Sequence, residues 1–382
     1  MGARMNTALD TIRTGSGGPT RIGTVVVGGA QAGLVMGYYL QRKNADFVIL
    51  EAHPRVGDVW RQRYDSLRLF SIPRYASLPG WRIPVRDFPT RDEFADYLEQ
   101  YAAHFDLPVR TGVRVVQVCR HEDGSLLVQT TDGSYLADSV VVATGSYQRP
   151  FTPDFAAEID PSVVQLHSMG YRNPGQLAPG AVLVVGAANS GTDVALDATA
   201  AGHPTWLAGR HPGQVPVDID SRRARPFIPI VMFVFKHVLT LRTPVGRKVR
   251  PEVLGHGTNL VRNKLSDLDA AGVVRIGRIT GVHEGQPITE DGPVPDIATI
   301  VWCTGAHPDY RFLDLPSVDA EQRPEERRGV SSESGLYFLG LEFQFALASA
   351  TIQGLDRDAR YLVRQMRQAG KLRRTARQRV AA

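Results

Sequence analysis

Two glycine-rich turns are the residues of this chain best suited to bind a reactive cofactor. Each lies between a run of β-branched residues and a predicted helix. The first turn consists of Gly28, Gly29, Ala30, Gln31, Ala32 and Gly33. The second turn includes Gly186, Ala188, Asn189, Ser190 and Gly191. Such a turn lets the backbone approach a pyrophosphate at a helix N-terminus, and alanine, the smallest alternative, replaces the middle glycine in both copies. We therefore predict two dinucleotide-binding turns, with a purely structural βα turn as the alternative.

The residue that follows the next strand differs in charge between the two copies. Glu51 follows the first, and Arg210 follows the second. A carboxylate there accepts hydrogen bonds from a ribose 2′-hydroxyl, whereas an arginine fits a 2′-phosphate. This difference predicts FAD at the first turn and NADPH at the second, and it makes electron transfer the expected chemistry. Three further residues are alternatives to Arg210 as partners of the phosphate: His211, Arg222 and Arg223.

Alternating strands and helices must position the first turn. The strand 24–27, the helix 32–43 and the strand 46–50 predict one βαβ unit with the turn at the helix N-terminus. Residues 52–90 are irregular in pattern, because prolines recur and aromatic residues are interspersed. A loop this long within a compact domain is usually functional. An amphipathic helix is predicted over 91–104, with two acids in its first turn.

Further predicted strands and helices flank the second turn in the sequence. Strand patterns at 113–120, 125–130 and 135–142 are separated by Asp-Gly hairpin signals. The second βα unit opens near Gly180, and a last helix is predicted over 350–366. The strands 113–142 precede the second turn, and the last helix follows it.

The order of the elements implies a domain inserted within a domain. A chain of 382 residues allows two domains, since single cores stop growing at roughly 250–300 residues. We expect an α/β fold with two Rossmann-like, three-layer ββα dinucleotide-binding domains, the NADPH domain inserted into the FAD domain. The expected boundaries are 1–20 for a flexible N-terminus, 21–155 and 296–370 for the FAD domain, 156–295 for the NAD(P)H domain and 371–382 for a basic flexible tail.

The net charge is concentrated near the C-terminus. Between Arg360 and Arg379 there are eight Lys or Arg residues and no acid, which exceeds the net charge of +5 of the whole chain. The rest of the chain is therefore mildly acidic. A solvated helix end with cations at its C-terminus explains this stretch better than a nucleic-acid patch, so no nucleic-acid partner is expected.

Cysteine usage and hydropathy exclude several classes of function. Cys119 and Cys303 lie far apart and form no CxxC pair, so neither a dithiol centre nor a metal site is expected. Residues 1–20 lack the apolar stretch of a secretory signal, which favours a cytoplasmic protein. The apolar part of the insertion 222–241 is interrupted by Lys236 and is too short for a bilayer, which needs roughly 20 apolar residues. A core helix or a lid over the substrate mouth is expected there, with membrane association as the alternative.

The longer motifs carry a family resemblance. Together with both glycine turns and Glu51, Gly57-Asp58-Val59-Trp60, the run 63–69 and the run 167–174 resemble the flavin-containing monooxygenases, which are class B flavoprotein monooxygenases. The resemblance is closest to the YUCCA-like branch of bacterial and plant FAD-NAD(P)-binding oxidoreductases. It continues through Cys303-Thr304-Gly305 and 335–354, and so covers nearly the whole chain.

At Pro161, Val163 and Tyr171 the sequence departs from the pattern of that family. Pro161 and Val163 stand where the family has Phe-x-Gly before His167. Tyr171 stands where the Baeyer–Villiger branch has tryptophan, which tilts the resemblance toward oxygenation of heteroatoms.

The resemblance implies an FAD- and NADPH-dependent monooxygenase. Such an enzyme oxygenates a small nucleophilic substrate at nitrogen, sulfur or carbon through a C4a-(hydro)peroxyflavin, and the cofactor carries the hard step. The expected partners are a small-molecule substrate and O2, and a homodimer is left open. Two alternatives remain at this stage: an NADPH-dependent FAD reductase or oxidase without oxygenation, and a non-enzymatic flavoprotein that serves as redox sensor or ion-transport accessory.

The resemblance also extends the set of candidate site residues. The catalytic candidates are Ser71, His167 and Asn189. Further expected cofactor-binding residues are Val59, Trp60, Val115, Ala143, Thr144, Gly145, Cys303, Thr304, Gly305 and Gly340. For His167 a structural role competes with proton donation, and for Asn189 capping of its helix competes with a reach toward the nicotinamide.

Two segments are expected beside the flavin. The loop 61–82 is expected near the flavin ring and the substrate, with Arg68, Ser71 and Tyr75 as candidates, and a packing loop is the alternative. By family analogy the last helix directs its N-terminus at the pyrimidine edge of the flavin, where it would stabilise a reduced, anionic ring.

Overall fold

The computed structural model describes residues 18–214, 228–255, 260–294, 296–319 and 323–375. Three predicted features lie wholly or largely outside these residues. They are the flexible N-terminus 1–20 except its last residues, the alternative phosphate partners Arg222 and Arg223, and the end of the basic tail from 376 onward.

The first lobe is built on a sheet whose centre is parallel and almost wholly buried. β1 pairs in parallel with β2 on one side and with β6 on the other. In spatial order the main path is β17 (Leu313–Asp314), β4 (Val115–Arg120), β5 (Leu126–Thr130), β6 (Gly133–Val142), β1 (Thr20–Val27), β2 (Phe47–Leu50) and β3 (Val109–Arg110). β6 also pairs with β20 (Leu336–Phe338), from which β19 (Val330–Ser331) and β18 (Glu326–Arg327) continue. Runs of valine suit such strands because both faces of the sheet are covered.

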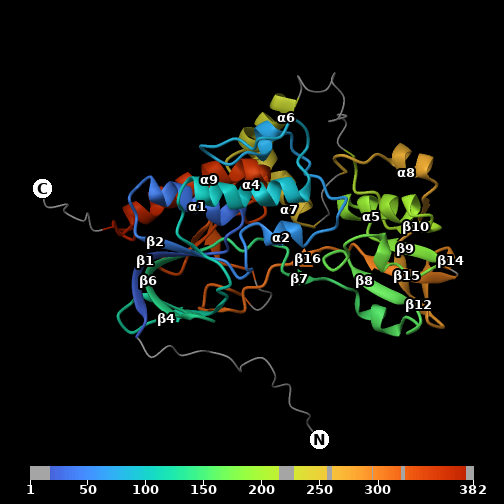
Figure 1. Cartoon of the computed structure of the whole chain (residues 1–382), viewed down its shortest axis with the longest axis horizontal. Coiled ribbons are helices and arrows are strands. Elements are labelled where there is room, and N and C mark those ends of the chain that lie inside the picture. Colours follow the sequence, from blue (N-terminus) through green and yellow to red (C-terminus); the bar gives the residue numbers. More distant parts are fainter. Residues whose placement is uncertain (1–17, 215–227, 256–259, 295, 320–322, 376–382) are drawn as a thin grey trace, which may run out of the picture.

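Helices cover one face of this sheet and the antiparallel β4–β5–β6 meander lies toward the other (Figure 1). The covering helices are α1 (Gln31–Gln41), α4 (Arg91–His104) and α9 (Ile352–Gln368). The predicted helix 91–104 is confirmed, and a capping box between Thr90 and Glu93 explains why it begins where it does.

The second lobe repeats the parallel arrangement. Its sheet has the order β11 (Val274–Ile276), β10 (Thr205–Ala208), β9 (Ala181–Val185), β15 (Ile297–Trp302) and β8 (Val164–His167), with every pair parallel. α5 (Asn189–Ala200) and α8 (Leu265–Ala271) lie on one side of the sheet in Figure 1. A small antiparallel sheet lies toward the other side: β12 (Ile279–His283), β13 (Gln286–Thr289) and β14 (Gly292–Pro293). The predicted fold class, two Rossmann-like units with one inserted into the other, is confirmed.

Two chain crossings join the lobes side by side. β7 (Arg149–Pro150) leaves the first lobe and β16 (Ala306–His307) returns to it, and the two pair antiparallel. The expected boundary at residue 296 is therefore wrong, because the strand 297–302 pairs with β8 and β9 rather than with the first sheet. A strand that is buried on both faces has the same apolar pattern in either sheet, so its pattern did not reveal its partner.

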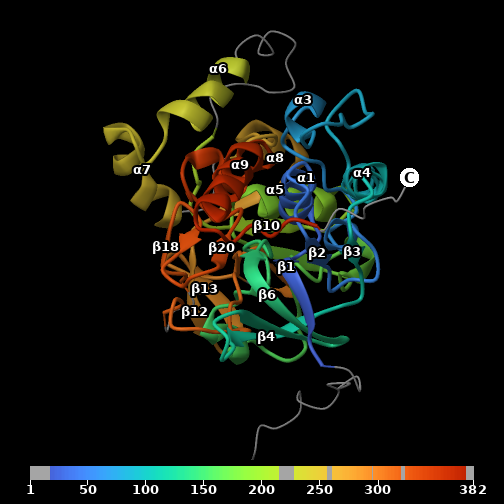
Figure 2. The ribbon, with the colours of Figure 1, turned by 90° about the vertical axis from the view of Figure 1, so that its left-hand side faces the viewer.

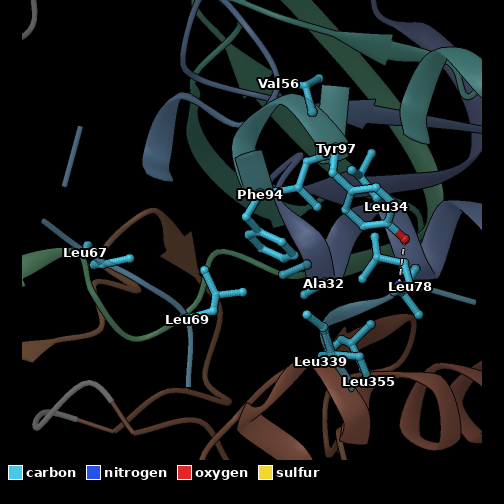
Figure 3. Close-up of a cluster of buried hydrophobic side chains, with 14 of the residues drawn as sticks. Ala32, Leu34, Val56, Leu67, Leu69, Leu78, Phe94, Tyr97, Leu339 and Leu355 are labelled. Carbon is cyan, nitrogen blue, oxygen red and sulfur yellow. Dashed lines mark hydrogen bonds between the residues drawn. The ribbon is translucent and has the colours of Figure 1, made fainter. Parts of the chain in front are cut away.

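The long loop 52–90 contains two short helices, α2 (Asp58–Arg61) and α3 (Pro73–Ala76), and is held by tyrosines of α4. The Tyr97 hydroxyl accepts from the Leu78 N–H at 2.7 Å and donates to the Trp81 carbonyl at 2.7 Å. Figure 3 shows Tyr97 reaching Leu78 beside the buried Phe94 and Leu34. The loop thus packs as part of the core rather than as a free surface segment.

The insertion projects from the body of the molecule (Figure 2). Its described elements are α6 (Ile228–Phe233) and the π-helical turn Val234–Val238, and α7 (Pro244–Gly255) follows it in the chain. The expected core helix is wrong, because the side chains of Ile230 and Phe233 are each 59% exposed. Beyond α6 the chain reaches the first lobe, where Leu241 donates its N–H to the Phe345 carbonyl. Among the described residues no helix combines the length and apolar character that a membrane crossing requires.

The remaining short elements are 3-10 turns. They are η1 (Asp154–Glu158), η2 (Pro174–Gln176) and η4 (Leu347–Ala350), and the last of these leads directly into α9.

Candidate functional site

The two glycine turns have the same backbone geometry. A Cβ on Gly33 would lie 1.8 Å from the Gly28 carbonyl oxygen, and one on Gly191 would lie 1.7 Å from that of Gly186. Ala30 and Ala188 precede the helices in extended conformation, where a side chain is tolerated. The pattern therefore keeps glycine where the backbone demands it and admits alanine where it does not. In both copies the helix N-terminus, whose first N–H groups have no acceptor within the helix itself, faces the turn.

A second pair of motifs packs against these turns. A Cβ on Gly28 would lie 2.7 Å from the Ala143 carbonyl oxygen, and one on Gly186 would lie 2.3 Å from that of Cys303. The structure thus brings the segments 143–145 and 303–305 to equivalent places beside the two turns. The Thr144 hydroxyl is buried there and has no hydrogen-bond partner among the described residues, so it offers a polar contact that a dinucleotide at the first turn would complete.

Glu51 lies at the end of β2 and is held as a carboxylate. It accepts hydrogen bonds from the Gly29 N–H at 2.7 Å and the His53 N–H at 2.9 Å, and it contacts the His53 ring at 2.6 Å. Burial acts to raise the pKa of Glu51, but the hydrogen bonds from His53 and Gly29 outweigh it and hold the pKa below its ordinary value. The same contact raises the pKa of His53. Sequence reasoning missed His53, although it lies only two residues from Glu51.

Glycine occupies the corresponding position of the second copy. Leu50 pairs with Val27 in the first sheet, and Ala208 pairs with Val185 in the second, so Gly209 is the structural counterpart of Glu51. Arg210 is one residue further along. Gly209 has a φ of 138°, and a Cβ there would lie 3.2 Å from the Ala187 nitrogen, so this position carries no carboxylate.

A cavity of about 190 Å³ lies at this place. His211 and Arg275 both line it, together with Ala187 and Gly209. Arg275 comes from β11, the next parallel strand, and is paired with Asp269 at 3.2 Å. Sequence reasoning missed Arg275, because its approach depends on the pairing of β10 with β11. Arg275, and the lack of a carboxylate among the described residues that line this cavity, fit a dinucleotide that carries an additional phosphate.

Asn189 does not cap its helix, so that alternative is wrong. The N-cap of α5 is Ala188. The side-chain Oδ1 of Asn189 instead accepts a hydrogen bond from the Val261 N–H at 3.0 Å. Asn189 therefore fastens the segment that follows residue 259 to the second glycine turn.

Asp193 of α5 forms a buried junction between the lobes. It accepts from the Tyr64 hydroxyl at 2.8 Å, from Arg262 at 2.6 Å and from Asn263 at 2.6 Å. Burial, followed by the charge of Asp193, raises the pKa of Tyr64, so that its hydroxyl remains a donor. The Ser190 hydroxyl also hydrogen-bonds with Tyr64. The junction links the long loop of the first lobe to the helix that starts at the second turn.

Both ring nitrogens of His167 have partners. Its Nε2 lies 3.0 Å from the Gly305 carbonyl oxygen, and its Nδ1 accepts from the Met169 N–H at 3.1 Å. Burial lowers the pKa of His167 despite the contact with Gly305, which favours the neutral ring. Burial also raises the pKa of the neighbouring Cys303 thiol to about 12, so this thiol is not a nucleophile at neutral pH.

Residues of the long loop take different directions. Trp60 donates its ring N–H to Gln31 at 3.0 Å and so joins α2 to the first residue of α1, while Val59 beside it is 36% exposed. Arg68 turns toward the Phe88 carbonyl at 3.4 Å, whereas Tyr75 lines a larger cavity of about 500 Å³. Ser71, which lies between Arg68 and Tyr75 in the sequence, is half-buried.

Two remaining candidates border the first turn from other elements. A Cβ on Gly340, which has a φ of 92°, would lie 3.6 Å from Leu355 and 3.7 Å from Ala32. The segment before α9 therefore passes directly by the turn. Val115 begins β4, and the Val113 N–H donates to the Glu51 carbonyl at 2.9 Å, which keeps the start of this strand near the end of β2.

Comparisons with known proteins agree with this geometry. Residues 25–227 match the family model described as pyridine nucleotide-disulphide oxidoreductase. An uncharacterized CzcO-like oxidoreductase of Geobacillus kaustophilus is 36% identical over 346 residues, 90% of this chain and 97% of that protein. A probable indole-3-pyruvate monooxygenase of Arabidopsis thaliana, YUCCA3, is 27% identical over 361 residues, 83% of this chain and 82% of that protein. The solved flavin-containing monooxygenase of Stenotrophomonas maltophilia is 28% identical with a TM-score of 0.75, covering 91% of this chain and 99% of that one.

Proposed function

We propose that this chain, which belongs to the pyridine nucleotide-disulphide oxidoreductase family, is a monooxygenase that takes its electrons from NADPH. The chain is an oxidoreductase and a flavoprotein with the fold of the flavin monooxygenases, and its cofactors are FAD and a nicotinamide dinucleotide. The observation that carries the proposal is the pair of equivalent turns, with a buried carboxylate beside one and cations beside the other.

The residues of the first lobe would hold FAD. The N–H groups at the start of α1 would receive the pyrophosphate, and Glu51 would accept the ribose hydroxyls. Thr144 and Gly340 border the same place. Bound there, FAD supplies two-electron transfer from the nicotinamide and the activation of O2. In this proposal residues 21–155 and the part of the chain from β16 to 370 form the FAD domain.

The residues of the second lobe would hold NADPH. The start of α5 would receive the second pyrophosphate, and His211 and Arg275, which line the cavity, would bind the 2′-phosphate. Arg210, which follows Gly209 in the sequence, would be their third partner. Residues 156–305, which include β15, form this domain in the proposal. The choice of NADPH over NADH rests on these cations and on Gly209, which puts no carboxylate where a phosphate would lie.

The chain's own residues keep the two cofactors in a fixed relation and exclude water. The hydrogen bond between Tyr64 and Asp193 joins the long loop to the helix of the second turn, and both side chains are at least 96% buried. A neutral His167 holds the return crossing at Gly305. Such a closed junction protects a reactive flavin from side reactions with water. The substrate of the proposed reaction is a small nucleophile with a soft nitrogen, sulfur or carbon centre.

The decisive experiment separates oxygenation from simple electron transfer. The purified holoprotein is reduced with NADPH without oxygen and is then mixed with O2 in a stopped-flow spectrometer. We expect rapid bleaching of the flavin and then a spectrum, neither oxidised nor reduced, that persists while NADP⁺ is bound. Immediate reoxidation with stoichiometric H2O2 would contradict oxygenation and indicate an oxidase or reductase. Failure of NADPH to bleach the flavin would contradict both and favour a redox sensor.

A further inference from the structure

The larger cavity, of about 500 Å³, is an open pocket lined by three segments that are far apart in the sequence. They are the loop 74–82, Lys236 of the insertion, and the first turns of α9 at 352–356. In Figure 2, α3, α6 and α9 lie toward the same end of the molecule. The volume falls within the range of about 300–1,000 Å³ that is typical of small-molecule pockets.

Positive charge predominates around this cavity. Arg74, Arg82 and Lys236 line it, and none of the three forms an ion pair within the described part of the chain. The one carboxylate in the lining, Asp356, already accepts from the Tyr39 hydroxyl and pairs with Arg360. Burial lowers the pKa of Lys236, although Asp356 acts in the opposite direction. A half-buried ammonium without an ion pair is stabilised when an anion binds beside it.

The walls that complete the cavity are apolar and fixed. Trp81 stacks on His104 with ring centroids 4.8 Å apart and on Tyr97 at 5.5 Å, so its indole has one orientation. Tyr75 and Ile352 add further apolar surface. The side-chain oxygen of Gln353 is buried and has no hydrogen-bond partner in the described part of the chain, which leaves an acceptor for a ligand to satisfy.

The cavity adjoins the elements that border the first glycine turn. Leu355, next to Asp356 in α9, lies in the same buried cluster as Ala32, and both would contact a Cβ on Gly340. Figure 3 shows Leu355 and Leu339 close to Ala32. A ligand in the cavity would therefore lie against the helix that packs on the FAD-binding element.

We propose that this cavity binds the substrate, and that the substrate is a small organic anion with an apolar or aromatic body. Its carboxylate, or another anionic group of that size, is held by Lys236, Arg74 and Arg82, and its body lies against Trp81 and Tyr75. This inference rests on the proposed function for the identity of the ligand as substrate, but the binding of anions can be measured without any turnover.

The test measures binding to the oxidised holoprotein. The panel contains phenylacetate, hexanoate, phenyl phosphate and the neutral phenylacetamide, each titrated by calorimetry. Because a hydrogen bond to a charged group contributes about 1.5–3 kcal/mol, we expect at least one anion to bind about tenfold or more tightly than the amide. Lys236→Met should remove that advantage, and Arg74→Gln should reduce it. Tighter binding of phenyl phosphate than of the carboxylates would assign the anion as a phosphate monoester.

Arg86→Gln is the matched control, since Arg86 is an exposed arginine of the same loop and is not part of the cavity lining. It should leave all affinities within about twofold. The rate of flavin reduction by NADPH, measured for each variant, reports that the fold and cofactor sites are intact. The proposal is overturned if no anion binds better than the amide, or if Lys236→Met and Arg86→Gln behave alike. Anion binding without oxygenation would refute the proposed function and leave this site standing.

Discussion

Replacing Glu51 by glutamine tests the central assignment of the first turn. The carboxylate receives three contacts, from the Gly29 N–H, the His53 N–H and the His53 ring, all at 2.9 Å or less. Glutamine retains one acceptor oxygen but points an amide donor at these donors, so Glu51→Gln removes charge and introduces an unfavourable contact. We expect this variant to bind FAD much more weakly.

The magnitude follows from the kind of contact that is lost. A hydrogen bond to a charged group contributes about 1.5–3 kcal/mol, so each lost contact to the ribose weakens FAD binding by about 10- to 150-fold. The assay titrates apoprotein with FAD and follows the quenching of flavin fluorescence. Glu122→Gln is the control, because Glu122 is an exposed acid of the same lobe. In folded Glu51→Gln, we expect the Kd for FAD to rise and the Kd for NADPH to stay the same. An unchanged Kd for FAD would refute the reasoning.

The remaining predictions concern the pair at the first turn, the lobe junction and the second turn. The pKa of His53 is raised, so its contribution to stability is complete below its ordinary pKa of 6.5 and is lost as the pH rises through the folded-state value. His53→Gln should therefore lower the free energy of unfolding more at pH 6 than at pH 9, and an equal loss at both would count against an ion pair. Tyr64→Phe leaves the buried Asp193 short of a donor and should lower the unfolding free energy in urea by about 1–3 kcal/mol, whereas the same change at the exposed Tyr147 should have little effect. Arg275→Ala should raise KM for NADPH much more than KM for NADH, and equal changes would mean that Arg275 does not contact the phosphate.

Local features of the fold could be predicted from the sequence because their causes are local. The helix 91–104 follows from its apolar spacing and the Thr90–Glu93 capping box. The glycine turns follow from backbone contacts between residues only five positions apart, such as Gly28 and Gly33. A pattern within one window of sequence determines such elements.

Features that depend on distant partners could not be predicted in this way. In the sequence Asp193 looks like any other polar residue of a helix. In the structure it accepts a hydrogen bond from Tyr64, which is 129 positions away. The strand that ends at Trp302 has the pattern of any buried parallel strand, so its membership of the second sheet was visible only in its pairing. Arg275 enters the second site because β11 lies beside β10, a fact of register rather than of motif. The cationic cavity likewise needs three segments that no single motif contains.

The two glycine turns differ mainly in the residue that follows the neighbouring strand, and in the proposed function this residue affects the direction of electron flow. Glu51 and Gly209 stand at the same register, after backbones that are otherwise equivalent. In the proposed function, a buried carboxylate at that register would repel a phosphate on the neighbouring ribose, whereas glycine would admit one beside Arg275 of β11. On this proposal the same backbone would select an unphosphorylated ribose in one lobe and tolerate a phosphate in the other. The two dinucleotides would then bind without exchanging places, and the nicotinamide would serve as donor to a flavin that stays in its own lobe.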